Sequence, residues 1–166
     1  MNAIHDNLPG AALPASDSDR RQQWRDLGAR AHQLRAATRA ADHFTARGDE
    51  SDTHTGGWLM STAVSLAEDL AADIDSLARA LKEGPPDPAL QQQVAPLRVR
   101  AHQLHAAARA ADHFLELDTR EDRDTGSWLI ATALGLATKL AAELDDQVVS
   151  SRRPEGGGRR VASAAN

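Results

Sequence analysis

The sequence predicts an all-α protein, specifically a four-helix bundle built from two tandem antiparallel helical hairpins. Three observations support this fold. Apolar residues recur at steps of three and four along most of the chain, no segment alternates as a half-buried strand does, and the second half of the chain repeats the first at an offset of 70 residues. Both ends are rich in small, polar or charged residues without periodicity, so we expect disordered tails at 1–18 and 150–166.

The internal repeat defines the domain organisation. When residues 22–75 are aligned with 92–145 without a gap, 29 of the 54 pairs are identical. Each hairpin alone would expose an apolar stripe, and packing one hairpin on the other with pseudo-twofold symmetry buries both stripes. We therefore expect hairpin repeats at 19–83 and 89–149 to form one domain, joined by a Gly/Pro linker at 84–88.

The first segment of each repeat predicts an amphipathic helix, from about residue 19 to 47 and from about 88 to 117. In the first copy, the residues at helical spacing on one face are Leu27, Ala31, Leu34, Thr38, Ala41 and Thr45. Seven Arg and three Asp lie between Asp19 and Arg47, whereas Glu68 to Asp75 carries four acids and no base. This contrast in charge predicts that the two segments lie against each other.

The second segment of each repeat carries a stronger apolar stripe, and we expect helices at about 56–82 and 126–148. In the first copy the stripe consists of Leu59, Ala63, Leu66, Leu70, Ile74, Leu77 and Leu81. Thr55 and Thr125 directly precede these segments and are predicted N-caps, because a hydroxyl can accept a hydrogen bond from a free amide of the first turn.

The loops expected between the helices of each hairpin, 48–54 and 118–124, collect carboxylates. They lack the ligand spacing, the central Gly and the closing Glu of an EF-hand, so we interpret them as solvated loops.

The composition of the chain excludes several classes of functional site. The chain has 166 residues and no Cys, which excludes disulfides, thiolate metal sites and thiol nucleophiles. Its formal charge of −5 argues against a dedicated nucleic-acid binder, and weak contact to RNA would come only from the tail arginines. These are Arg152, Arg153, Arg159 and Arg160. Since the N-terminus has no signal-peptide pattern and no run of 18 apolar residues occurs, we expect a cytoplasmic, bacterial protein without a membrane partner.

One polar helix face is the strongest candidate for a functional surface. It lies opposite the apolar face of the first helix of each repeat, and its residues are identical in the two copies. It comprises His32, Ala36, Arg39, Ala40 and His43, with His102, Ala106, Arg109, Ala110 and His113 in the second repeat. A solvated face has little reason to stay identical when 25 of 54 pairs changed, so we interpret it as an interface to a second copy or to another protein. The alternative is a solvated face rich in a good helix former in a recent duplication.

A ligand site is the second hypothesis. Trp58 and Trp128 begin the second helix of each repeat, near the expected position of Phe44 and Phe114. They are expected to plug the ends of the bundle, or to frame a small pocket with His43 and His113 at each end. No metal or cofactor is predicted, because the first-helix histidines of one repeat stand roughly 16 Å apart along the helix axis.

No nucleophile elbow, Gly-rich phosphate loop or paired-carboxylate motif occurs, so no enzymatic activity is predicted. The sequence therefore favours a non-enzymatic helical interaction module, with a small-ligand, metal or haem-binding bundle as the alternative.

Overall fold

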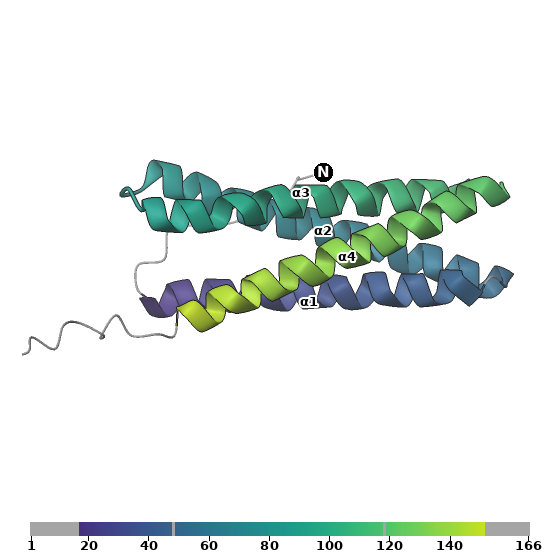
Figure 1. The fold of residues 1–166 in the computed structure, drawn as a ribbon, viewed down its shortest axis with the longest axis horizontal. Coiled ribbons are helices and arrows are strands. Elements are labelled where there is room, and N and C mark those ends of the chain that lie inside the picture. The colour runs from purple at the N-terminus through teal and green to yellow at the C-terminus, as the bar shows by residue number, and fades with distance from the viewer. Residues whose placement is uncertain (1–16, 48, 118, 152–166) are drawn as a thin grey trace, which may run out of the picture.

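The computed structural model describes residues 17–47, 49–117 and 119–151, which form four helices. These are α1 (Asp17–Arg47), α2 (Glu50–Glu83), α3 (Pro88–Glu116) and α4 (Arg120–Ser150). Figure 1 shows that α1 and α3 run in one direction and that α2 and α4 run in the other. Both α1 and α3 pack against α2 and α4, so α1 and α3 occupy diagonal corners. The prediction of an all-α four-helix bundle is confirmed.

The core forms where the predicted stripes meet along the bundle axis. Leucines and isoleucines from all four helices are essentially inaccessible there, including Leu34, Ile74, Leu104 and Leu144. Between them lie buried alanines, which keep the helices close and the core thin. Thr38 is the buried polar residue of this core, and its hydroxyl donates to the Leu34 carbonyl oxygen at 2.9 Å, so its polar atom is satisfied. Complete burial of each leucine contributes roughly 1.5–3 kcal/mol.

The second helix of each hairpin begins about six residues before its expected start. The side chain of Asp49 caps α2 by accepting from the Asp52 amide at 2.7 Å, and Thr119 caps α4 by accepting from the Asp122 amide at 3.1 Å. Carboxylates in a first helical turn also interact favourably with the positive end of the helix dipole. The acidic stretches expected to be loops are therefore mostly helix N-termini.

The prediction that Thr55 and Thr125 are N-caps is wrong. Both lie inside their helices, and their hydroxyls donate to carbonyl oxygens one turn earlier, on Ser51 and Glu121, at 3.0 Å. The capping role passes to Asp49 and to its aligned residue in the second repeat, because the apolar stripe alone does not mark where a helix begins.

The connection between the repeats runs from Gly84 to Asp87, and Pro88 of the expected linker belongs to α3. Gly84 ends α2 and donates its amide to the Ala80 carbonyl oxygen at 2.9 Å. Asp87 caps α3 by accepting from the Leu90 amide at 3.0 Å, and Pro88 occupies the first helical position, where its missing N–H costs nothing.

The tail predictions fall mostly outside the described residues. Residues 17 and 18 begin α1, and residue 150 ends α4, so the helices extend slightly into both segments expected to be disordered.

Among the described helices, α4 is the one long and apolar enough to meet the criteria of a membrane span, with a mean hydropathy of 1.2 over its best 18-residue window. Core helices of bundles meet the same criteria. Within the bundle, α4 packs along both α1 and α3 and buries Ile130, Leu140 and Leu144. Within the bundle, the apolar side chains of α4 that give it this hydropathy therefore form part of the core.

Candidate functional site

The predicted interaction face lies mostly on the outside of α1 and α3. Ala36, Arg39 and His43 are exposed, and Ala40 is half-buried. Their aligned residues in α3 have the same exposure. Because α1 and α3 occupy diagonal corners, the two copies of the face lie on different sides of the bundle.

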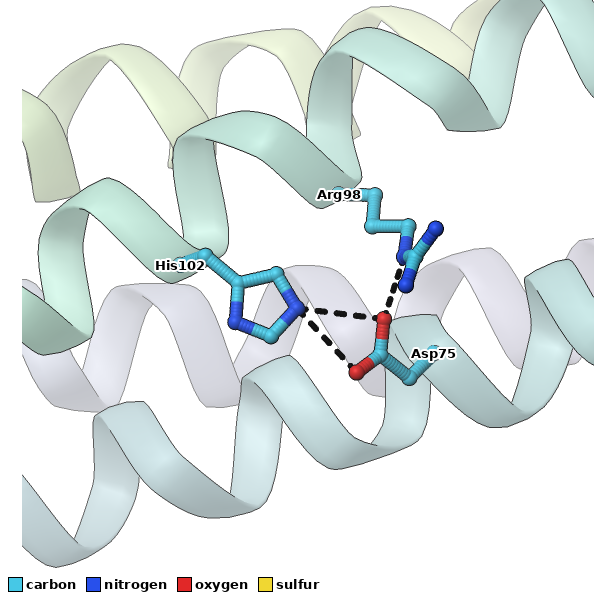
Figure 2. Close-up of polar contacts among 3 residues, drawn as sticks. All are labelled: Asp75, Arg98 and His102. Carbon is cyan, nitrogen blue, oxygen red and sulfur yellow. Dashed lines mark hydrogen bonds and ion pairs between the residues drawn. The ribbon is translucent and has the colours of Figure 1, made fainter.

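The two histidines nearest the middle of α1 and α3 contact the neighbouring hairpin. His102 Nε2 lies 3.2 and 3.1 Å from the two carboxylate oxygens of Asp75 on α2 (Figure 2). His32 Nε2 makes the same contact with Asp145 on α4, at 3.2 and 3.0 Å. Each histidine thus joins a helix of one hairpin to a helix of the other, at the edge of the predicted face.

These carboxylate partners are not predicted by the helical periodicity of the sequence. Asp75 and Asp145 are the last identical pair in the 70-residue alignment, and that identity is the signal that could have found them.

Arginines make the matching contacts within each hairpin. Arg30 on α1 pairs with Asp73 on α2, and Arg100 on α3 pairs with Glu143 on α4. The first pair confirms the expectation, drawn from charge, that the basic first segment lies against the acids of the second. The two repeats therefore share two polar contacts: one arginine contact within each hairpin and one histidine contact between the hairpins.

The two histidine sites differ at one position. In the second repeat, Arg98 Nε also donates to Asp75, so two side chains of α3 hold one carboxylate (Figure 2). In the first repeat, the residue aligned with Arg98 is Gly28. The Asp75 side chain is 28% exposed and the Asp145 side chain is 55% exposed.

The neighbouring carboxyls Asp73 and Asp75 have pKa values shifted in opposite directions. Burial raises the pKa of Asp73, assisted by the nearby charge of Asp69, and Arg30 offsets only part of this increase. Burial also acts to raise the pKa of Asp75, but the hydrogen bonds and charges of Arg98 and His102 outweigh it and hold the pKa below its usual value.

These shifts predict opposite effects of pH on folding. Because its folded-state pKa is lowered, Asp75 stabilises the fold above pH 3.8 and loses that contribution as pH falls through the folded-state pKa. Asp73 has a raised pKa, so its ionisation costs stability as pH rises above 3.8. We expect Asp75→Asn to weaken the acid-induced loss of stability and Asp73→Asn to strengthen it, each by about 1 kcal/mol or less. Urea unfolding between pH 3 and 7 measures both, and the same change in both variants would contradict the assignment.

The prediction that Trp58 and Trp128 plug the bundle is wrong, because each side chain is 68% exposed. Since α2 and α4 start earlier than expected, both tryptophans lie on the outer surface of a formed helix rather than at its end. The phenylalanines near the hairpin tips contact the adjacent histidines edge to face instead, with ring centroids 5.6 Å apart for His43–Phe44 and 5.8 Å apart for the aligned pair.

The residues of the predicted ligand pocket belong to the two hairpin tips. Both hairpin tips lie at the same end of the bundle (Figure 1), so these residues do not lie at opposite ends as expected. An open groove of about 680 Å³ lies between the start of α2 and the end of α3. Its lining is Thr53, His54, Gly57, Trp58, Ser61, Asp112, Leu115, Glu116, Leu117 and Arg123. Of the predicted pocket residues, it includes Trp58 and omits His43, Phe44, His113, Phe114 and Trp128.

Within residues 17–47, 49–117 and 119–151, no three His, Asp or Glu side chains are grouped so that they could hold a metal ion. Comparison with known protein families, curated proteins and solved structures finds no match to this chain.

Proposed function

We propose that this protein is a non-enzymatic, cytoplasmic module for protein–protein association in a bacterium, and that it binds through the outer faces of α1 and α3. The observation that carries the proposal is the exposure of Ala36, Arg39 and His43 together with their identity in the second repeat. None of these residues contributes to the bundle core. An arginine beside small residues can anchor a closely packed interface.

A small-ligand site is the second candidate, and the groove beside α2 favours it. There, Ser61 Oγ donates to the Asp112 carboxylate at 2.7 Å, and Trp58 supplies an exposed aromatic surface. Concave sites that combine apolar and polar groups are typical of ligand binding. The groove is open rather than enclosed, so we rank this function below protein association.

The association face can be tested by charge insertion. Replacing Ala36, Ala40, Ala106 and Ala110 together by Glu should reduce the mass measured by light scattering to the 17.8 kDa monomer, without loss of helix content. The reason is that unpaired carboxylates cannot be buried in an interface. Ala72→Glu and Ala142→Glu, on the exposed surfaces of α2 and α4, are the matched controls and should leave the mass unchanged.

In-cell crosslinking supplies the second measurement. A monomeric wild type whose crosslinked proteins are the same as those of the fourfold variant would overturn the proposed function.

A further inference from the structure

The two outer faces are not equivalent, because Arg98 binds the carboxylate beside one face and Gly28 stands at the aligned position beside the other. In the second repeat, Arg98 and His102 both bind the Asp75 carboxylate, so this carboxylate already has an arginine partner. In the first repeat, His32 keeps the place of His102, but Gly28 provides no side chain in the place of Arg98.

At Asp145, the buried Gly28 brings the α1 backbone close but contributes no guanidinium. A Cβ built on Gly28 would lie 3.7 Å from the Asp145 carboxylate, an ordinary van der Waals contact, so the α1 backbone comes close without filling the site. Within the part of the chain that the structure describes, His32 is the one side chain that hydrogen-bonds or ion-pairs with Asp145. Since the Asp145 side chain is 55% exposed, an outside group can reach its carboxylate from solvent.

We propose that Asp145 and His32 form an arginine-binding site and that Arg39 of a second copy of this chain fills it. This inference rests on the proposed function and names the partner of the α1 face. Arg39 is exposed and makes no hydrogen bond or ion pair with the described residues. It lies seven residues beyond His32, roughly 10 Å along the α1 axis, so it is displaced from Asp145 of its own chain.

A twofold axis passing near Ala36 places the two groups within reach of each other. When two copies of α1 cross antiparallel at Ala36, Arg39 of one copy is level with Gln33 of the other, roughly 7 Å along the axis from Gly28, a distance that the long arginine side chain has to span. The small side chains of Ala36 and Ala40 allow the two helix axes to approach to about 8 Å, the lower end of the usual range.

Each copy then places its Arg39 guanidinium in the Asp145 site of the other copy and binds the Arg39 of that copy in its own Asp145 site. The interface therefore contains two identical charge-assisted contacts, as an isologous dimer requires.

An arginine site beside one face only would limit the proposed assembly to a dimer. Two equally adhesive faces on opposite sides of the bundle would link copies into an open chain. Because Arg98 already occupies the Asp75 site, the α3 face offers no place for an arginine from another copy. The proposed dimer therefore forms through the α1 face, and the α3 face is left for association with a different protein.

The decisive variant supplies the missing arginine within the chain. Gly28→Arg copies the second repeat, and Arg is also a better helix former than Gly, so the fold should be retained. We expect the wild type to sediment as a dimer of twice 17.8 kDa and Gly28→Arg to weaken dimerisation more than about tenfold. Gly135→Arg is the matched control, because Gly135 is an exposed helical glycine with open space around it, and it should leave the dimer intact.

Charge reversal tests the pair itself. Arg39→Asp and Asp145→Arg should each dissociate the dimer, and the double variant should restore it. Arg109→Asp, at the aligned position of the other face, should have no effect. Arg98→Gly should open the second site and give assemblies larger than a dimer.

The outcomes separate this inference from the proposed function. A dimer that Ala36→Glu dissociates, but that Gly28→Arg and Arg39→Asp leave intact, would overturn the arginine site while keeping the association face. A monomeric wild type would overturn the second copy as occupant, and the crosslinking experiment would then decide the proposed function separately.

Discussion

Leu34→Ala is expected to lower the free energy of unfolding by about 2–5 kcal/mol. The Leu34 side chain is 0% exposed in the middle of α1, and its truncation leaves a cavity in a core that is already thin. Since the total stability of a domain is typically only about 5–15 kcal/mol, this one change removes a large fraction of it. Equilibrium urea unfolding, followed by circular dichroism, measures the loss.

The duplication provides an internal control for this prediction. Leu104 is the aligned residue in α3 and is 1% exposed, so Leu104→Ala should cost nearly the same free energy. Val99→Ala removes an exposed apolar side chain from the same helix and should change stability by about 0.5 kcal/mol or less. A large difference between Leu34→Ala and Leu104→Ala would contradict the equivalence of the two repeats in the core.

Gly56→Ala is expected to destabilise the protein by about 1–3 kcal/mol, although alanine is the better helix former. A Cβ at Gly56 would lie 2.5 Å from Thr45 Oγ1, 3.2 Å from the Thr45 amide nitrogen and 3.3 Å from the Ala41 carbonyl oxygen. The first contact can be relieved by rotating Thr45, but the other two involve the backbone of α1. The two helices must therefore separate slightly. Thermal or urea unfolding detects the change.

The next residue gives a matched comparison. A Cβ at Gly57 meets nothing within 4 Å, so Gly57→Ala should stabilise the protein by about 0.5–1 kcal/mol through helix propensity alone. Adding Thr45→Ala to Gly56→Ala should recover part of the lost stability, because it removes the nearest clash. Equal effects of the two glycine substitutions would show that α1 and α2 are not in close contact here.

The helices and the core could be predicted because they depend on local periodicity. Leu27, Ala31 and Leu34 on α1, like Leu70 and Ile74 on α2, follow the 3.6-residue repeat and are buried as that repeat requires. The first residue of each helix is harder to predict, because the apolar stripe begins one turn or more after the helix starts. The caps that fix those starts are Asp49 and Thr119, which lie in stretches resembling polar loops.

The contacts of the candidate site depend on pairing between distant helices, which periodicity does not reveal. His32 and Asp145 are separated by 113 residues along the chain, and only the antiparallel register of α1 and α4 brings them together. The exposure of Trp58 was also not predicted. Because α2 starts at Glu50 and not near residue 56, Trp58 lies on the outer surface of a formed helix. The alignment of the two repeats does pair Asp75 with Asp145, and this identity marks both residues as candidates for the site.

The up-down-up-down arrangement also suggests how such a chain arose. A single hairpin of this kind leaves its apolar stripe in water, so an ancestor of half this length would have had to pair with a second copy of itself. In that ancestor, the contacts of His32 with Asp145 and of His102 with Asp75 would have joined two subunits. Fusion of two such genes would turn those subunit contacts into intramolecular ones. Aligned positions such as Gly28 and Arg98, which the symmetry of a homodimer would hold identical, could then differ.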